Sequence, residues 1–126
     1  MKKKLAWGGH ALVWSGDWTE AGARKSISGA KRSGYDYVEV ALLDPWRVDA
    51  KMTKDLLDEY GIHATASLGL SPKTDVTSTD PKIVAAGDEL LRKATDVLHA
   101  IGGTELCGVL YCNLGKYPGP ASKENY

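Results

Sequence analysis

The sequence contains no phenylalanine, two cysteines, two methionines and no excess of charge of either sign across its 126 residues. Its 16 basic and 16 acidic side chains cancel. This balance removes the basic surface typical of nucleic-acid-binding proteins and the attraction to anionic membranes. No apolar run approaches the roughly 18 residues of a membrane-spanning helix. We therefore expect neither a nucleic-acid partner nor a membrane partner.

The two cysteines are too few for a disulfide framework. Cys107 and Cys112 lie in one strand-like run, and their odd spacing predicts opposite faces of a strand, where they can neither pair nor share a metal. We expect two small buried side chains in a reducing compartment. Lysines at positions 2–4 precede an apolar stretch that Gly8-Gly9-His10 interrupts, so no signal peptide is indicated and a cytoplasmic location is predicted.

The residues that are present are typical of one globular domain over residues 1–126, with 43% hydrophobic and 25% charged residues. Four short apolar runs, at residues 5–14, 37–43, 62–70 and 105–111, are predicted as buried strands. Helical periodicity lies between them, at residues 19–33, 50–60 and 81–101. This alternation predicts a parallel sheet with right-handed crossovers, covered by helices on one face and by a packed interior on the other.

Local signals support the three predicted helices. Asp80 is a suitable N-cap residue and Pro81 suits the first helical position, while Asp49 is the expected N-cap of the second helix. Gly22 and Gly29 lie inside the first helix, where each weakens helix formation by about 1 kcal/mol relative to alanine. We interpret these two glycines as a sign either of close packing or of a tight fit on a sheet.

The last residues resemble the beginning of another helix. Ser122 is a good N-cap residue after Pro118-Gly119-Pro120, and the sequence ends within the first turn that would follow. We expect a fourth helix that is cut off near its start. The alternative is a disordered polar tail.

Six segments occur in an order and spacing that resemble one enzyme family. They are residues 14–18 (Trp-Ser-Gly-Asp-Trp), 34–40 (Gly-Tyr-Asp-Tyr-Val-Glu-Val), 67–70 (Ser-Leu-Gly-Leu), 74–78 (Thr-Asp-Val-Thr-Ser), 80–81 (Asp-Pro) and 107–111 (Cys-Gly-Val-Leu-Tyr). Along almost its whole length the sequence resembles the N-terminal half of the ketose 3-epimerases of the D-tagatose/D-psicose type. These enzymes belong to the xylose-isomerase-like TIM barrels.

The resemblance implies an α/β fold that is half of a (βα)8 TIM barrel, with four parallel βα units, since a whole barrel takes roughly 250 residues. In the family, a divalent metal, typically manganese, is bound by Glu, Asp, His and Glu on strands five to eight, and the two glutamates move the proton at C3. None of those strands is expected here. We therefore expect no catalytic residue, metal ligand or cofactor in this chain, which would be an epimerase-derived half-barrel that is inactive alone.

The same correspondence places a group of side chains at or near the sugar pocket. Two of them depart from the family, because His10 stands where relatives often have an aromatic residue and Leu114 stands near where many have tryptophan. The expected substrate-binding residues are His10, Trp14, Glu39, Ala66, Ser67, Leu110, Tyr111 and Leu114.

The residues themselves leave alternatives open. Glu39 is the one carboxylate in a strongly apolar strand, so it either faces the barrel mouth or belongs to a structural ion pair. His10 lies near the carboxyl end of the first strand, where barrel active sites collect, and is either a ligand contact or a hydrogen-bonded wall residue. Trp14 either forms a platform for a sugar or packs against the first loop. Three loop cations are expected to be solvated rather than to meet a sugar hydroxyl or phosphate: Arg47, Lys73 and Lys116.

A four-stranded half-barrel leaves two edge strands unpaired and one face uncovered. Two copies related by a twofold axis solve this, because strand four of each copy pairs with strand one of the other. A complementary C-terminal half-barrel solves it as well. A homodimer that holds a sugar or polyol without chemistry is the alternative function, and a monomeric open sheet with helices on both faces is the alternative fold.

Overall fold

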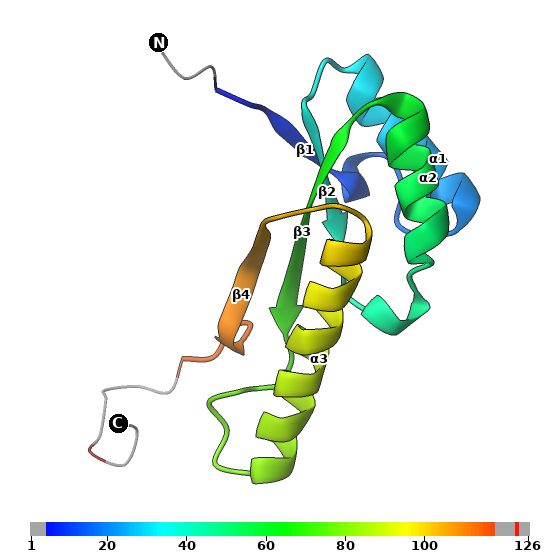
Figure 1. Cartoon of the computed structure of the whole chain (residues 1–126). Coiled ribbons are helices and arrows are strands. Elements are labelled where there is room, and N and C mark those ends of the chain that lie inside the picture. Colours follow the sequence, from blue (N-terminus) through cyan, green and yellow to red (C-terminus); the bar gives the residue numbers. More distant parts are fainter. Residues whose placement is uncertain (1–4, 118–122, 124–126) are drawn as a thin grey trace.

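The computed structural model describes residues 5–117 and residue 123. The described part forms one parallel sheet with the strand order β1-β2-β3-β4, and helical segments connect successive strands (Figure 1). The predicted helix start at Ser122 and the lysines at positions 2–4 lie outside the described residues. In chain order the elements are β1 (Gly8–His10), η1 (Ala11–Val13), α1 (Glu20–Arg32), β2 (Tyr37–Ala41), η2 (Pro45–Arg47), α2 (Ala50–Tyr60), β3 (His63–Leu70), α3 (Pro81–Ala100) and β4 (Leu106–Asn113).

The helix starts agree with the predicted capping residues. Asp49 Oδ1 accepts the Met52 N–H at 2.9 Å where α2 begins, and Asp80 Oδ1 accepts the Lys82 N–H at 2.9 Å where α3 begins. Pro81 occupies the first turn of α3, where its missing N–H removes no helical hydrogen bond. All three predicted helices are confirmed.

The first strand is much shorter than the predicted 5–14. Only Gly8–His10 pairs with β2, and the chain then turns into the 3₁₀ helix η1. The turn is held by local hydrogen bonds, because His10 Nδ1 accepts the Leu12 N–H at 3.2 Å and the Ala11 carbonyl accepts the Trp14 N–H at 3.0 Å. The Ser26 hydroxyl of α1 donates to the same carbonyl at 3.1 Å, which ties the turn to the helix.

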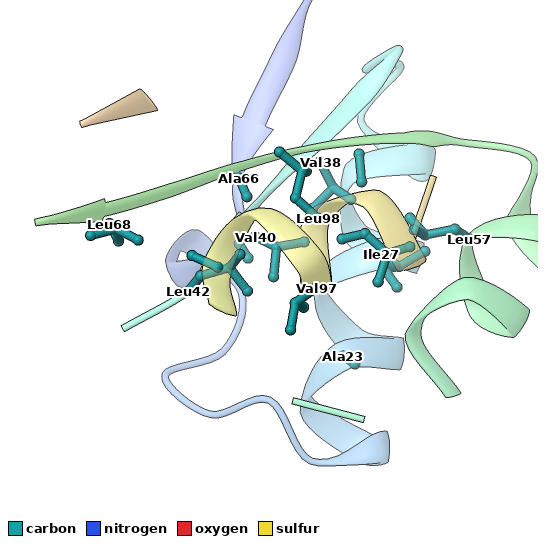
Figure 2. Packing of buried hydrophobic residues seen from close by; sticks show 14 of the residues in the cluster. Ala23, Ile27, Val38, Val40, Leu42, Leu57, Ala66, Leu68, Val97 and Leu98 are labelled. Atoms are coloured by element: carbon teal, nitrogen blue, oxygen red, sulfur yellow. The ribbon is translucent and has the colours of Figure 1, made fainter. Parts of the chain in front are cut away.

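One face of the sheet carries the hydrophobic core. Burial alternates along β2 and β3, so that every second side chain is buried, as expected when one face packs and the other does not. Val38, Val40 and Leu42 pack with Ile27 of α1 and Leu98 of α3 in this core (Figure 2). The three α-helices cover this face, and in residues 5–117 no helix covers the other (Figure 1). The predicted half α/β barrel is confirmed, and the alternative with helices on both faces is not observed.

Two glycines of α1 lie where other segments approach the helix closely. A Cβ on Gly22 would overlap Asp17 Oδ1, and a Cβ on Gly29 would lie 2.5 Å from Cδ1 of Trp14. Real Cβ atoms do not approach other atoms so closely, since protein interiors are packed at crystal-like density. Of the two interpretations, close packing is confirmed, whereas a tight fit on the sheet is not observed, because both glycines contact the loop after β1.

Both edges of the sheet are open in the described part of the chain. Each edge strand, β1 and β4, pairs with a single neighbour, so half of its backbone groups face away from the sheet. Large apolar side chains stand exposed beside these edges, with Leu5 and Trp7 before β1 and Leu114 after β4. Open edges flanked by exposed apolar residues mark surfaces where another chain segment can add to a sheet.

Candidate functional site

The face of the sheet opposite the helices, here named the open face, carries a row of polar side chains. In parallel strands, residues that are partners in register point to the same face. His10 of β1 is the partner of Glu39 of β2, and Ser67 of β3 is the partner of Cys107 of β4. Thr65 of β3 is the partner of Glu39 and belongs to the same face. Every strand therefore contributes at least one polar group to the open face.

Three of these side chains lie close together. His10 Nε2 lies 3.5 Å from Glu39 Oε1 and 3.3 Å from the Ser67 hydroxyl oxygen. The side chains of His10 and Glu39 are 37% and 30% exposed, respectively, so a small molecule can reach both. Glu39 thus faces the open side of the sheet, with its carboxylate beside the His10 imidazole and not in a buried ion pair.

Cys107 joins this group, although the sequence predicted a buried side chain. Cys107 is exposed, Cys112 is half-buried and both thiols are free, so the predicted burial is wrong. No α-helix follows β4 in residues 106–117 to cover the strand. Partial burial of the sulfur, together with the nearby Glu39 carboxylate, raises the pKa of the Cys107 thiol, so the thiol stays protonated at neutral pH. No signal in the sequence indicated this position of Cys107. Its place on the open face follows from its register with Ser67, which only the strand pairing reveals.

Two of the expected pocket residues lie away from the open face. Ala66 is fully buried in the core on the helix-covered side, one position from Ser67 and on the opposite face. The indole of Trp14 packs edge-on against Tyr35, with ring centroids 6.2 Å apart, and covers Gly29 of α1. Trp14 therefore packs against the first helix and its loop, as in the second of the two interpretations.

The remaining expected residues lie at the carboxyl end of β4. Leu110 packs partly against the core, whereas Tyr111 and Leu114 are 71% and 65% exposed. Leu114 Cδ2 lies 3.7 Å from the position that a Cβ on Gly69 would take, so Leu114 stands next to the end of β3. The register of β4 shifts between Gly69 and Leu70, which is why the face of each residue after Val109 does not follow from simple alternation.

A groove that the sequence did not indicate lies between the loops that follow β1 and β2. It has a volume of about 380 Å³. Asp17 in this groove accepts hydrogen bonds from the backbone and the hydroxyl of Thr19, and these bonds lower the pKa of its carboxyl. Trp18 also lines the groove and donates its indole N–H to Thr53 at 2.9 Å, which joins the loop to α2.

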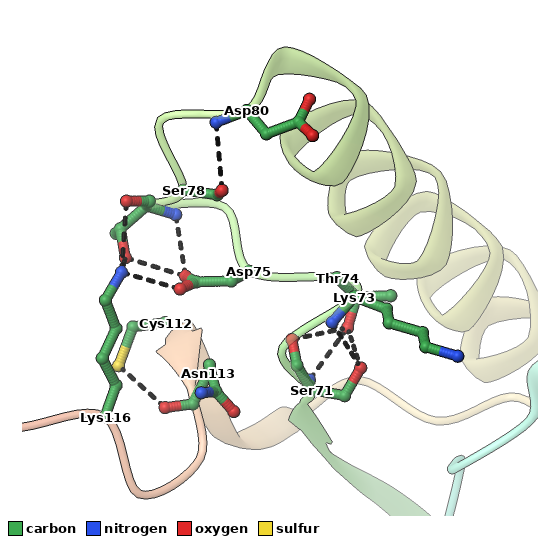
Figure 3. A network of polar contacts seen from close by, with 10 residues as sticks. Ser71, Lys73, Thr74, Asp75, Ser78, Asp80, Cys112, Asn113 and Lys116 are labelled. Atoms are coloured by element: carbon green, nitrogen blue, oxygen red, sulfur yellow. Dashed lines mark hydrogen bonds and ion pairs between the residues drawn. The ribbon is translucent and has the colours of Figure 1, made fainter.

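A second polar network ties the loop before α3 to the end of β4 (Figure 3). Lys116 Nζ donates to Asp75 Oδ2 at 2.7 Å and to the Thr77 hydroxyl at 2.8 Å. Asp75 is only 5% exposed, and its bond to Lys116, followed by those from Thr77, holds the pKa of its carboxyl well below the usual range. Lys116 is therefore not the solvated loop charge that the sequence predicted.

This network gives the fold a dependence on acid. Because the carboxyl of Asp75 has a lowered pKa in the folded chain, its contribution to stability is fully present above about pH 4 and is lost as the pH falls further. We expect Asp75→Asn to lower the melting temperature by several degrees at pH 7 and to flatten its decline below pH 4. Thermal unfolding between pH 7 and pH 2 measures both effects.

The matched control is Asp58→Asn, which removes an exposed partner of Lys54 on α2. Exposed pairs of this kind contribute little to stability, so this variant is expected to melt close to the parent chain at pH 7. Equal losses in the two variants would contradict the assignment of the acid dependence to the buried carboxylate.

Within residues 5–117, no three His, Cys, Asp or Glu side chains converge in a way that could hold a metal ion. His10 and Glu39 supply two donor groups, which is short of the three or four protein ligands of common metal sites. The described side chains of the open face therefore fall short of such a metal site by at least one ligand. Among residues 5–117, no helix is long and apolar enough to cross a membrane.

Four parallel strands joined by three α-helices, with one helix-covered face and one polar open face, define the described part of this chain as half of a TIM-type α/β barrel. No family model matches the sequence. The chain is 75% identical to the L-ribulose 3-epimerase of Methylomonas sp. (strain DH-1), over 98% of this chain and 43% of the relative. It is 47% identical to the ketose 3-epimerase of Arthrobacter globiformis, over 91% of this chain and 40% of the relative.

Solved structures agree with these relatives. The D-allulose 3-epimerase from Methylomonas sp., in complex with D-allulose, superposes with a TM-score of 0.91 at 75% identity, over 98% of this chain and 43% of that one. An L-ribulose 3-epimerase structure superposes with a TM-score of 0.87 at 24% identity, which shows the shared fold. The chain thus spans less than half the length of the relatives it matches. The predicted resemblance to the N-terminal half of the ketose 3-epimerases is confirmed, and the chain is an epimerase-like half-barrel.

Proposed function

We propose that this chain is the first half of a ketose 3-epimerase barrel and that its open face forms one wall of the sugar pocket. The observation that carries the proposal is the 75% identity, over 98% of the chain, to an L-ribulose 3-epimerase. A related structure is named as a complex with D-allulose, so a free ketose is the proposed substrate. The cytoplasm is the proposed location, consistent with two free cysteines.

The chain by itself is proposed to be catalytically inactive. Epimerisation beside a ketone needs a base that removes the proton, an acid that returns one to the opposite face, and stabilisation of the enediolate. The four strands as described carry a single carboxylate, Glu39. The second carboxylate and the divalent metal that the resemblance implies would come from another half-barrel.

The partner is proposed to add to the open edges of β1 and β4. Either a complementary C-terminal half-barrel or a second copy of this chain closes eight strands without leaving an edge. A second copy favours the alternative function, a dimer that binds a sugar or polyol without chemistry. One observation favours that alternative. The polar side chains of His10, Glu39 and Ser67 lie together within a single chain and need no residue from another half-barrel to form this cluster.

Complementation separates these functions. We expect the purified chain to show no epimerisation of D-allulose or L-ribulose with manganese, and to gain activity when co-expressed with the part of the Methylomonas relative that this chain does not match. Activity of the purified chain alone would overturn the proposed division of labour. Binding of ketoses by a dimer of this chain, with no activity upon complementation, would favour the alternative.

A further inference from the structure

The two ring nitrogens of His10 serve different partners. Nδ1 accepts the backbone N–H of Leu12 at 3.2 Å and thereby caps η1. A ring nitrogen that accepts a hydrogen bond carries no proton, so in the neutral ring the proton is on Nε2. The local backbone therefore selects the Nε2–H tautomer, and this N–H points toward the open face.

The Nε2–H lacks a well-formed acceptor. Its distances of 3.3 Å to the Ser67 hydroxyl and 3.5 Å to Glu39 Oε1 both exceed the roughly 2.7–3.2 Å of a good N–H···O bond. Donor and carboxylate nevertheless point toward the same region, and both side chains are about one-third exposed. An oxygen atom of a ligand that entered this region would find one donor and one acceptor within reach.

A hydroxyl group suits this arrangement because it can accept one hydrogen bond and donate another. Its oxygen would accept from His10 Nε2–H, and its proton would be donated to the Glu39 carboxylate. An anionic group suits it poorly, since the four strands as described contain no lysine or arginine and Glu39 would repel it. The neighbouring Cys107 thiol stays protonated and adds no charge.

We propose that His10 and Glu39 together bind one hydroxyl group of an uncharged polyol, with His10 Nε2–H as the donor and Glu39 as the acceptor. The Leu12 N–H holds the imidazole ring in place through its bond to Nδ1. Both residues are then specificity-determining groups that recognise the sugar and take no part in proton transfer. The inference rests on the proposed function, because it requires the open face to be a wall of the sugar pocket.

Variants can separate this role from the support that His10 gives to the fold. His10→Asn retains a capping side chain, since asparagine is favoured at this position, yet it is too short to reach Glu39. Glu39→Gln keeps the size of the side chain and removes its charge. Thr65→Val is the matched control, because Thr65 lies on the same face in register with Glu39.

In the two-chain assembly described above, His10→Asn and Glu39→Gln are each expected to raise KM for a free ketohexose by about ten- to a hundredfold. We expect kcat to change by less than about threefold, and Thr65→Val to change neither. The double variant should resemble the single variants, since both act on the same hydroxyl. A ketohexose that lacks the bound hydroxyl group cannot lose this contact. For one monodeoxy ketohexose, KM should therefore be the same with the parent, with His10→Asn, with Glu39→Gln and with the double variant. Additive losses, a fall confined to kcat, or an equal loss in Thr65→Val would overturn the proposal.

The tautomer is tested on the chain alone, without any activity. Nitrogen-15 NMR of the histidine rings, assigned with His10→Asn, should show a proton on Nε2 of His10 and none on Nδ1. Titration with D-allulose should shift this Nε2–H, and titration with inorganic phosphate should not. A proton on Nδ1, or no shift with the ketose, would overturn the inference. Lack of activity in the two-chain assembly, with the expected NMR result, would instead count against the proposed function.

Discussion

Replacement of Gly87 by valine is expected to lower the free energy of unfolding by about 3 kcal/mol. Gly87 lies on the buried side of α3, where a Cβ would overlap the carbonyl oxygen of Thr74 and lie 2.8 Å from Val76 Cγ1. Thr74 cannot withdraw easily, because its N–H donates to the Ser71 carbonyl at 2.9 Å. The whole loop before α3 must move, and the Asp75–Lys116 network moves with it.

Urea unfolding of Gly87→Val measures this loss as a shift of the midpoint at constant slope. Ala85→Val is the matched control, since it introduces the same side chain at an exposed position of the same helix. Helix propensity alone favours Gly87→Val and disfavours Ala85→Val, each by about 0.5 kcal/mol, so it acts against the expected difference between the two variants. Equal midpoints in the two variants would show that the close approach of Thr74 does not limit the size of residue 87.

Ile27→Ala is expected to produce a loss of similar size, about 3 to 4 kcal/mol. Ile27 is fully buried in α1 and packs in the single core between helices and sheet (Figure 2). The variant loses apolar contacts and leaves a cavity that the surrounding strands cannot fill. Because natural domains are stable by only about 5–15 kcal/mol, we expect partial unfolding of the isolated chain near body temperature.

Calorimetry and near-ultraviolet circular dichroism check this expectation. Val13→Ala is the control, since Val13 is apolar but 73% exposed, and its truncation should leave the melting temperature nearly unchanged. Ile27→Val removes one methylene group and should lower stability by about 1 kcal/mol. A melting temperature for Ile27→Ala within one or two degrees of the parent would contradict the assignment of Ile27 to the core.

The helices could be predicted because their signals are local. Asp49, Asp80 and Pro81 act within one turn of the positions where α2 and α3 begin, and local capping depends little on the rest of the fold. The parallel sheet followed from the alternation of the elements. These predictions depend little on distant parts of the chain, and the structure agrees with the predicted helices and the predicted parallel sheet.

The end of β1 could not be predicted, because the turn after His10 depends on contacts made in three dimensions. The apolar run from Ala11 to Trp14 has the composition of a strand, yet a side-chain acceptor at His10 and a hydroxyl from Ser26 of α1 stabilise η1 instead. The hydroxyl contributes a contact fifteen residues away in the sequence. Periodicity within a short window contains no information about such a partner.

The sequence indicated on which strands the candidate residues lie but did not separate the two faces of β3, and their role in binding a sugar stays a prediction. His10, Glu39 and Ser67 do lie together on the open face, whereas Ala66 lies on the other face although it is adjacent to Ser67. A shift of one residue exchanges the two faces of a strand. A resemblance that locates the correct segment of β3 can therefore include both Ala66 and Ser67, although only one of them faces the open side. Trp14 was ambiguous because an indole contributes apolar area both to cores and to sugar sites.

The order of the strands in the sheet also has a consequence for biosynthesis. Each strand pairs with the strand that precedes it in the chain, from β1 to β4. During translation, each new strand therefore finds its partner, the preceding strand, already outside the ribosome. We expect the βα units to dock one after another as they emerge, without waiting for a distant segment. Within the described residues, β4 is the strand that keeps its outer edge free for the next segment that arrives.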